Sequence, residues 1–394
     1  MTRFIIAACF VTVAASTFAD IIGWRAHRGL YPDANAVTEW ADDKNVIWKT
    51  GLPGQSNATP IIVGDRIFVC SEPTTLVCLS MKDGSILWEK SNDYSSDAGI
   101  NAGINADGMP LAHGTNGYSS PTPVTDGTFV YVLFATGVAA CYDMDGARQW
   151  AKLVEKPNHK WGHSASPILV NDTLIVHVLD VIGLDLVSGA EKWRTPAEHA
   201  WGSPVATRIG ATDVIITARR GDIIRASDGK KLLENSGGLQ YATPVIVDDI
   251  VYYVEGIARA VRLKAVGDAV ELANLWTTKI RGSRHYGSVV VDNGLIYASS
   301  REGSFAALDA VTGDVLYETK LNISGATNSV YSSIVLAGKH IHVGSEEGVT
   351  VVIEPGRAFA EVTRNTIEGF RSTPVFVDDR MYVRTFGNLY CIGK

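Results

Sequence analysis

Short apolar runs of about four to six residues alternate with turn residues along most of this chain. In the clearest unit, the runs TPIIV, RIFVC, LVCLS and SILWEK follow one another between residues 59 and 90, and β-branched and aromatic residues dominate them. Such runs, separated by Gly, Asp and Pro, are typical of short antiparallel strands. The pair Asp83-Gly84 stands before the fourth run, where a tight hairpin favours Asp-Gly. The unit therefore predicts a four-stranded antiparallel sheet.

The same unit recurs eight times. Its fourth strand is marked by an aromatic or apolar residue at intervals of about 40 to 45 residues, with one longer interval. These markers are Trp48, Trp88, Trp150, Trp193, Leu233, Trp276, Tyr317 and Val362. Each unit starts with one residue that is followed by two small residues and then commonly by Pro or Val. These starting residues are at positions 57, 118, 164, 201, 241, 286, 331 and 371. Four-stranded units at this period indicate the blades of a β-propeller.

An isolated strand near the start of the chain matches a strand that is missing from the last unit. The final unit has only three strands before the chain stops at Lys394, whereas NVIWKT at 45–50 has the shape of a fourth strand without the preceding three. Pairing the two would close the ring and leave no blade with an open edge. The sequence thus predicts an all-β fold, an eight-bladed β-propeller of four-stranded antiparallel blades in which the N-terminal strand completes the last blade.

The propeller pattern covers residues 45–394, and two other segments precede it. Residues 1–19 carry one basic residue, an apolar run and the small-residue site Thr17-Phe18-Ala19, which predicts a secretory signal peptide cleaved near Ala19. A lipidation box ending at Cys9 is the alternative. Residues 20–44 form a leader of undecided placement. No other segment is apolar enough to span a bilayer, so we expect a periplasmic or secreted protein of a bacterial cell envelope.

Charge and one insertion narrow the expected partners. Loss of Arg3 with the signal peptide would change the formal charge from −7 to −8. An acidic exported protein is a poor candidate for nucleic acid or anionic membrane surfaces, and we expect a monomer with a protein or peptide partner. An insertion at 91–117, rich in Gly, Asn and Asp, lengthens the connection between the first two units. We interpret it as a loop; a lid, or a Ca²⁺ loop using Asp97, Asn101, Asn105 or Asp107, is the alternative.

The candidate binding residues lie at the entrance of the innermost strands. The residue before the two small residues of each unit should ring one mouth of the axial channel. Five of these eight positions are aromatic, and His163 and His285 each precede one of them. The predicted mouth residues are Tyr118, His163, Trp201, Tyr241, His285, Tyr286, Tyr331 and Arg371, with Asn57 and Ser164 completing the ring. They either fill the channel mouth or form a recognition pocket with large contact area and polar groups.

The units resemble the PQQ-like (quinoprotein-type) β-propeller repeats. The resemblance is carried best by GSFAALDAVTGDVLYET at 303–319 and DGSILWEK at 83–90, and it extends over 45–394. Size, expected export and blade number are similar to the outer-membrane assembly factors of this group. Quinoprotein dehydrogenases of the group are longer and, as the resemblance implies, hold PQQ and Ca²⁺ with a vicinal Cys-Cys disulfide and an Asp base. This chain has no adjacent cysteine pair, so no cofactor is expected, with PQQ and Ca²⁺ as the alternative.

The remaining cysteines and histidines give weaker signals. Cys78, Cys141 and Cys391 occupy one slot of the third strand, where a small buried residue is expected; a Cys70–Cys78 disulfide across the hairpin is the alternative. His340 and His342 share a strand face, which we interpret as solvated rather than metal-binding. His159 and His163 fall in a loop. We find no Ser-His-Asp order, no phosphate loop and no carboxylate pair suited to acid–base work.

Three functions remain open from the sequence. A non-catalytic envelope scaffold or assembly factor that binds a protein or peptide fits the complete ring and the aromatic mouth. A PQQ-dependent oxidoreductase acting on an alcohol or sugar would need the mouth to bind the quinone and a divalent ion. A glycan-binding module would use the aromatic rings to stack on sugars.

Overall fold

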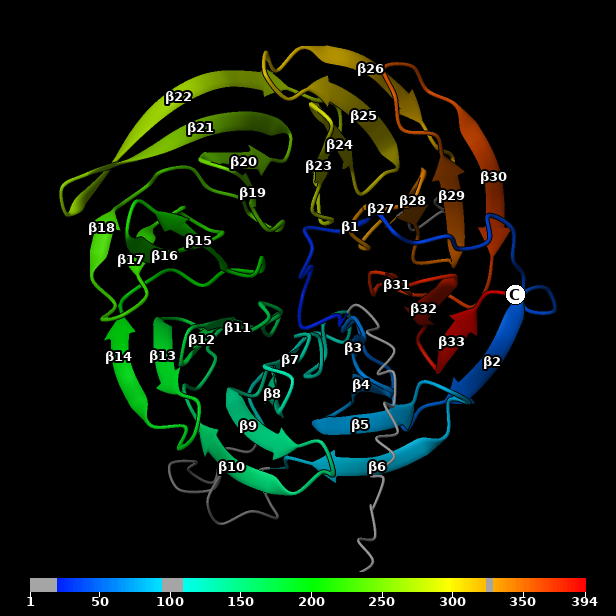
Figure 1. Ribbon diagram of the computed structural model, residues 1–394, viewed down its shortest axis with the longest axis horizontal. Coiled ribbons are helices and arrows are strands. Elements are labelled where there is room, and N and C mark those ends of the chain that lie inside the picture. The colour runs from blue at the N-terminus through cyan, green and yellow to red at the C-terminus, as the bar shows by residue number, and fades with distance from the viewer. Residues whose placement is uncertain (1–19, 94–108, 324–328) are drawn as a thin grey trace, which may run out of the picture.

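Eight antiparallel sheets surround a central axis in the computed structural model, which describes residues 20–93, 109–323 and 329–394 (Figure 1). The described residues form strands and turns, and none of them forms a helix. In every blade the strands follow one another from the axis outward. The predicted all-β, eight-bladed propeller is confirmed.

The strands of the first four blades have these bounds. Blade 1 consists of β3 (Ile61–Val63), β4 (Arg66–Ser71), β5 (Thr75–Ser80) and β6 (Ile86–Ser91). Blade 2 consists of β7 (Val124–Thr125), β8 (Phe129–Leu133), β9 (Val138–Asp143) and β10 (Arg148–Leu153). Blade 3 consists of β11 (Ile168–Val170), β12 (Thr173–His177), β13 (Val181–Asp185) and β14 (Glu191–Thr195). Blade 4 consists of β15 (Val205–Ile209), β16 (Thr212–Ile216), β17 (Ile223–Arg225) and β18 (Lys231–Leu233).

The second half of the ring continues in the same order. Blade 5 consists of β19 (Val245–Val247), β20 (Ile250–Val254), β21 (Ile257–Val266) and β22 (Ala269–Lys279). Blade 6 consists of β23 (Val290–Asp292), β24 (Leu295–Ser299), β25 (Ser304–Asp309) and β26 (Val315–Lys320). Blade 7 consists of β27 (Val335–Ala337), β28 (His340–Gly344), β29 (Val349–Ile353) and β30 (Glu361–Thr366). Blade 8 consists of β31 (Val375–Val377), β32 (Arg380–Arg384), β33 (Asn388–Ile392) and β2 (Val46–Gly51).

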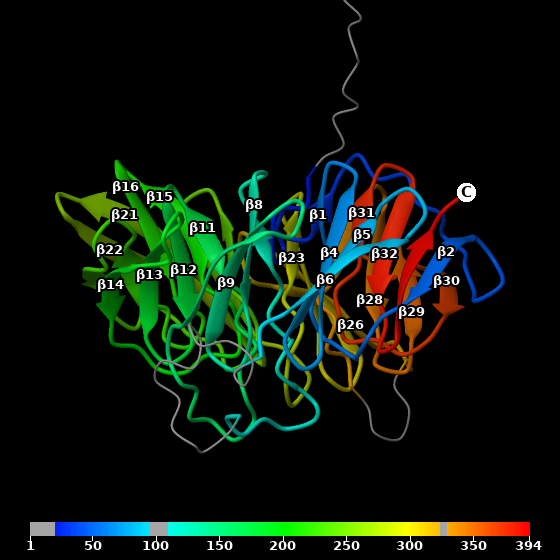
Figure 2. The ribbon, with the colours of Figure 1, turned by 90° about the horizontal axis from the view of Figure 1, so that it is seen from below.

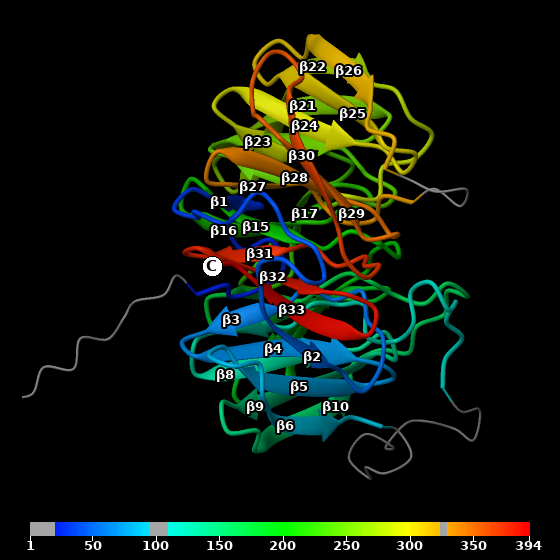
Figure 3. The same cartoon turned by 90° about the vertical axis from the view of Figure 1, so that its right-hand side faces the viewer.

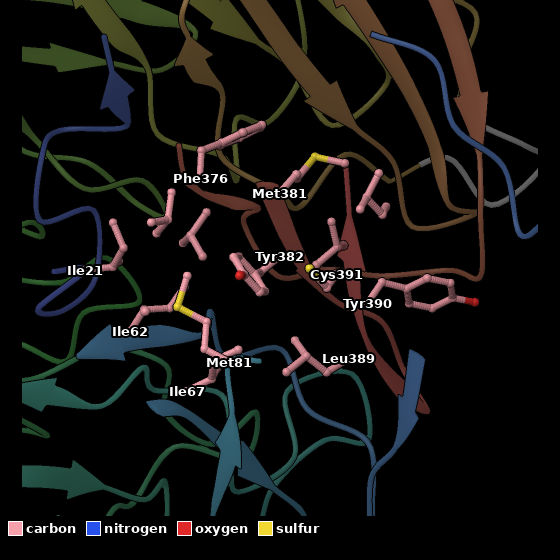
Figure 4. Close-up of a cluster of buried hydrophobic side chains, with 14 of the residues drawn as sticks. Ile21, Ile62, Ile67, Met81, Phe376, Met381, Tyr382, Leu389, Tyr390 and Cys391 are labelled. Carbon is pink, nitrogen blue, oxygen red and sulfur yellow. The ribbon is translucent and has the colours of Figure 1, made fainter. Parts of the chain in front are cut away.

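The N-terminal strand closes the ring as predicted. Strand β2 pairs antiparallel with β33, with Trp48 opposite Cys391 and Thr50 opposite Leu389. A buried apolar cluster at this closure joins residues of the leader, blade 1 and blade 8, and Figure 4 shows Ile21, Ile62 and Met81 facing side chains of β32 and β33. The two chain ends are therefore held together by strand pairing and by a shared core.

The marker residue of the fourth strand packs between neighbouring blades. Trp193 lies opposite Gly183 within its own sheet, and its indole N–H donates to the carbonyl of Ala226 in the next blade at 3.0 Å. The indoles of Trp88, Trp150 and Trp276 donate to the next blade in the same way. The residue facing each of these four tryptophans is small, because the indole lies across it. In blade 7 the residue with this pairing is Thr363, opposite Val352, so the marker predicted at Val362 was wrong by one position.

The four described cysteines are free and buried. Cys78, Cys141 and Cys391 face Trp88, Trp150 and Trp48 respectively, which confirms the small buried slot. Cys70 pairs with Leu76, and Cys78 pairs with Phe68 on the partner strand. The two cysteines of this hairpin therefore do not face each other, and the Cys70–Cys78 disulfide alternative was wrong.

The leader does not extend away from the ring. Its residues Leu30–Tyr31 form strand β1, which adds in parallel to the innermost strand β27 of blade 7. Ile21 bridges to Ile62 of blade 1, and further along Ala41 bridges to Thr366 of blade 7. The leader thus crosses the axis from blade 1 to blade 7 on one face of the ring before it reaches β2 (Figures 1 and 2).

One consequence of this packing is the burial of His342. Trp40 of the leader stacks on the His342 ring with centroids 5.9 Å apart, and Phe376 packs against it at 5.0 Å. The expected solvated face was therefore wrong for His342, which is 3% exposed. Burial lowers the pKa of His342 to about 3, and its Nδ1 atom has no hydrogen-bond partner among the described residues.

The neutral state of His342 predicts a loss of stability at acidic pH. The folded state cannot protonate this ring until about pH 3, whereas the unfolded chain protonates it below about pH 6.5. The neutral ring therefore costs no stability above about pH 6.5, and the free energy of unfolding declines as the pH falls from there toward 3. We expect His342→Phe to stabilise the protein by about 2 kcal/mol more at pH 5 than at pH 7.5, measured by denaturant unfolding.

The control for this prediction lies on the same strand. His340 is only partly buried, so His340→Phe should show a smaller pH-dependent difference. Equal effects of His342→Phe at the two pH values would contradict the buried neutral ring.

Candidate functional site

A cavity of about 410 Å³ lies on the propeller axis. Every blade contributes lining residues to it, and these residues lie just before the innermost strand of their blade. Trp201, Tyr241, Tyr286, Tyr331 and Arg371 of the predicted ring line it, together with Asn57 and Ser164. A volume of this size falls within the range that holds a small ligand or a short peptide segment. We call the end of the cavity formed by these residues the mouth.

Tyrosines from three consecutive blades form one wall of the mouth. The rings of Tyr286 and Tyr331 are parallel to within 2° with centroids 4.7 Å apart, and Tyr241 meets Tyr286 edge-on at 4.8 Å. Two arginines end this row: Arg284 lies 5.9 Å from the ring centre of Tyr241, and Arg371 lies 5.0 Å from that of Tyr331. Aromatic pairs and cation–π contacts each contribute about 0.5–1.5 kcal/mol. The wall is therefore ordered before any ligand arrives.

A half-buried carboxylate holds Tyr241 in position. Glu255, at the end of β20, accepts the backbone N–H groups of Tyr241 at 2.7 Å and of Ala242 at 2.9 Å. Burial raises the pKa of this carboxyl above its usual range, while the backbone N–H groups act in the opposite direction. The hydrogen bonds fix the backbone from which the aromatic side chain projects.

Tryptophan and histidine side chains form a second wall of the mouth. His159 and His199 stack with centroids 4.7 Å apart, and both meet Trp201 edge-on at 5.1 and 4.5 Å. Trp161 is 40% exposed and stacks on His113, from the described end of the insertion, at 3.9 Å. Burial, assisted by His159, lowers the pKa of His199 to about 4. The His199 side chain in this wall is therefore neutral at pH values well above 4.

Three predicted mouth residues do not line the cavity. The hydroxyl of Tyr118 donates to the carbonyl of Pro110 at 2.9 Å, and Ser120 lines the cavity in its place. The motif of blade 2 is Ser120-Pro121-Thr122-Pro123, so the sequence alignment had been set two residues early. His163 and His285 are 0% and 2% exposed and lie behind the wall. Burial lowers their pKa values to about 3 and about 4.

A closed ring of hydroxyl groups surrounds the deeper part of the cavity. In every blade a Ser or Thr hydroxyl accepts the backbone N–H of the equivalent residue in the preceding blade, at 2.9–3.1 Å. The members are, in order, Thr59, Thr122, Ser166, Ser203, Thr243, Ser288, Ser333 and Thr373. Because each oxygen accepts, its own hydrogen remains available to donate. Six of these residues line the cavity.

The leader closes the far end of the cavity. Trp24 lines the cavity, and its indole N–H donates to the Thr243 hydroxyl at 3.3 Å. Beside it Arg25 is buried and donates to the carbonyl of Ile334 at 2.9 Å and to that of Val289. The leader strand β1 pairs with the end of β27, whereas the mouth residues precede the innermost strands, so the leader closes the end of the cavity opposite the mouth and makes it a blind pocket. The side view in Figure 3 shows β1 beside the inner strand β27.

Sequence reasoning missed several of these residues. Trp24, His159, Trp161 and Arg284 line the cavity without belonging to the predicted ring. The hydroxyl ring did have a sequence signal, because every unit carries Ser or Thr two residues after its mouth position. The alternative Ca²⁺ loop of Asp97, Asn101, Asn105 and Asp107 lies outside the described residues, as does the predicted signal peptide at 1–19.

The residues of the cavity do not fit a PQQ–calcium site. Ca²⁺ requires several oxygen ligands, normally including carboxylates, and the described lining residues contain neither Asp nor Glu. No three His, Cys, Asp or Glu side chains of the described residues gather in a way that could hold a metal. We therefore derive no reaction step through such a cofactor.

Comparison with known proteins places this closed, blind-ended propeller in a family. The family model described as outer membrane protein assembly factor BamB matches residues 30–116, 114–265 and 269–392. The chain belongs to this family, and the resemblance to PQQ-like propellers is confirmed.

Individual relatives are distant. The chain is 24% identical to the outer membrane protein assembly factor BamB of Moranella endobia (strain PCIT), over 91% of this chain and 79% of the relative. It is 22% identical to the BamB of Yersinia pestis, over 90% and 78%. The crystal structure of BamB from Moraxella catarrhalis matches with a TM-score of 0.63 at 16% identity, over 89% of this chain and 99% of that one.

Enzymes share the same fold. A europium-containing methanol dehydrogenase matches with a TM-score of 0.59 at 11% identity, over 90% of this chain and 95% of that one. At these identities the likeness shows the fold alone, and the function has to be argued from the site.

Proposed function

We propose that this chain is an exported, non-catalytic propeller of the cell envelope that binds a protein or peptide partner at its axial mouth, as a scaffold or assembly factor. The observation that carries the proposal is the ordered aromatic mouth over a blind pocket, in a chain of the BamB family. Tyr and Trp are favoured at protein interfaces because they supply large contact area at low entropic cost. The match to named outer-membrane assembly factors supports an envelope location and a protein partner.

The geometry of the ring leaves one of its faces free when a partner occupies the mouth. Within the described residues, no helix has the length and apolar character to cross a membrane. The mouth residues precede the innermost strands and the leader strand β1 pairs with the end of β27, so a partner at the mouth would leave the leader face free. We propose that the protein acts as a monomer in the periplasm.

The test uses two tyrosines of the mouth. We expect Tyr241→Ala combined with Tyr286→Ala to reduce partner capture at least about tenfold, because hot-spot aromatics typically contribute 2 kcal/mol or more to binding. A photo-crosslinking residue placed at Tyr331 in cells of the source organism would report capture, with crosslinked proteins identified by mass spectrometry. The melting temperature should fall only slightly, since both rings are partly exposed.

A control position distinguishes the mouth from the rest of the surface. Val187 is 85% exposed in the turn between β13 and β14, at the opposite end of the strands from the mouth. A crosslinker there should not trap the same partner. Equal crosslinking in the double variant and the unmodified protein would remove the mouth as the binding site.

A calorimetric titration tests the oxidoreductase alternative. Because the lining lacks carboxylates, we expect PQQ to give no saturable heat with residues 20–394, with or without Ca²⁺. Saturable micromolar binding that requires the metal would contradict the non-catalytic function and identify the mouth aromatics as stacking partners of the quinone.

A further inference from the structure

The charged side chains that line the cavity are opposite in sign to the net charge of the whole chain. The protein has a formal charge of −7, yet the described residues lining the cavity include two arginines and no carboxylate. A random sample of this surface would bring acidic side chains to the mouth. The local excess of positive charge therefore identifies what the pocket can accept.

The two arginines differ in how far their charges are compensated. Arg371 pairs with Glu346 and also donates to the carbonyl of Thr115 at 2.5 Å. Arg284 donates to the Tyr286 hydroxyl at 3.3 Å and lies over the Tyr241 ring. In residues 20–93, 109–323 and 329–394 no ion pair to Arg284 is formed, and the carboxylate of the nearby Glu302 accepts hydrogen bonds from Ser283. Arg284 is therefore the arginine of the mouth whose guanidinium group is not bound by a carboxylate.

The deeper part of the cavity adds more hydrogen-bond donors. Six hydroxyl groups of the Ser/Thr ring line it, and each already uses its oxygen to accept a backbone N–H. Their hydrogens can point into the cavity. A lining rich in donors is matched best by a ligand group that only accepts, and an ionised carboxylate is such a group.

This rests on the proposed function and makes it more specific: we infer that the mouth recognises a short extended peptide segment that carries a carboxylate next to an aromatic or apolar side chain. The tyrosine wall and Trp201 contact the apolar side chain, while Arg284 and the hydroxyl ring bind the carboxylate. A cavity of about 410 Å³ admits a few residues, so the partner inserts a loop or a chain end rather than a folded domain.

A neutral sugar fits this lining less well than an acidic peptide. Sugar hydroxyls donate as well as accept, so a saccharide pocket needs acceptors, and carboxylates are the strongest of these. The cavity offers amide oxygens but no described carboxylate. An acidic saccharide remains a distinct outcome of the experiment.

The experiment compares four probes on the folded chain of residues 20–394. The first is a capped pentapeptide with two glutamates flanking a tyrosine, and the second carries glutamines instead. The third is the glutamine peptide with a free C-terminal carboxylate, which distinguishes a chain end from acidic side chains as the source of the carboxylate. The fourth is a trigalacturonic acid. Binding is followed by calorimetry and by the fluorescence of Trp24, Trp161 and Trp201, which line the cavity.

We expect a carboxylate-bearing peptide to bind at least about tenfold more tightly than the capped glutamine peptide, with the advantage reduced by added salt. Arg284→Gln should remove this advantage. Arg281→Gln is the matched control, because Arg281 belongs to the same loop, is exposed and pairs with Glu318 instead of lining the cavity. Both variants should keep the melting temperature of the unmodified protein.

Three results would overturn the inference. These are equal binding of the charged and neutral peptides, equal effects of Arg284→Gln and Arg281→Gln, and binding of the triuronide without binding of any peptide. If peptides bind without charge preference while the tyrosine double variant loses its partner, the proposed function stands and only the carboxylate preference fails. If the double variant also retains its partner, both fail.

Discussion

Replacing Trp193 with alanine is expected to destabilise the protein by about 3–5 kcal/mol, because the indole fills the space between blades 3 and 4. The ring is 9% exposed, lies across Gly183 in its own sheet and packs on Gly229 of the next blade. Loss of the indole N–H would also leave the carbonyl of Ala226 without this hydrogen-bond donor. Equilibrium unfolding in denaturant measures the change.

A double-mutant cycle shows whether the close contact with Gly183 is the cause. A Cβ at position 183 would lie 2.4 Å from Cε2 of Trp193, so Gly183→Ala alone should cost about 1–3 kcal/mol through overpacking. Once Trp193 is alanine, the added methyl group has room. The double variant should therefore be more stable than the sum of the single variants by at least about 1 kcal/mol.

Trp161→Ala provides the control for residue type. Trp161 is 40% exposed and is not part of a strand, so its replacement should change the free energy of unfolding by less than about 1 kcal/mol. Strict additivity of Gly183→Ala and Trp193→Ala would show that the two positions do not contact each other in solution.

Replacing Arg25 with alanine is expected to destabilise the protein by about 3 kcal/mol or more. The guanidinium group donates to the carbonyls of Ile334 at 2.9 Å, Arg28 at 2.7 Å and Val289. Hydrogen bonds to a charged group contribute about 1.5–3 kcal/mol each, and a buried carbonyl left without a donor costs about as much. Burial lowers the pKa of Arg25 to about 10, so the group remains charged at neutral pH.

Arg28→Ala is the matched control in the same turn. Arg28 is exposed and donates to one carbonyl, that of Ile246, at 3.0 Å. Its loss should cost less than about 1 kcal/mol. Thermal unfolding, with proteolysis of the leader as a second measurement, separates the two variants. If Arg25→Ala and Arg28→Ala behave alike, the leader does not hold blades 6 and 7 through this side chain.

The fold was predictable because short sequence features within each unit define the repeat. Each blade needs short apolar strands and tight turns such as Asp83-Gly84, and each tryptophan marker faces a small residue; these features recur at one period. The pairing of β2 with β33 followed from counting, since an incomplete last unit and an isolated first strand satisfy each other's hydrogen bonds. Errors arose where the motif was ambiguous, at Tyr118 and Val362, because Ser-Ser-Pro-Thr-Pro and Glu-Val-Thr-Arg each allow two alignments.

The candidate site was predictable only in part. Four aromatic mouth residues and Arg371 follow from the repeat, because equivalent positions of a ring must converge on the axis. Trp161 and Arg284 lie in irregular loops, where no period fixes the direction of a side chain. His163 and His285 stand one position before the mouth residues Ser164 and Tyr286, and that single step places them behind the wall instead of in the cavity.

By itself, the sequence determined the number of blades, their strand order and the closure of the ring, since all of these depend on hydrogen-bond pairing between segments with a common pattern. Only the tertiary structure decided the course of the leader, because residues 20–44 have no repeat and find their place through contacts with distant strands. Those contacts turn an open channel into a blind pocket lined by Trp24 and bury His342 beneath Trp40.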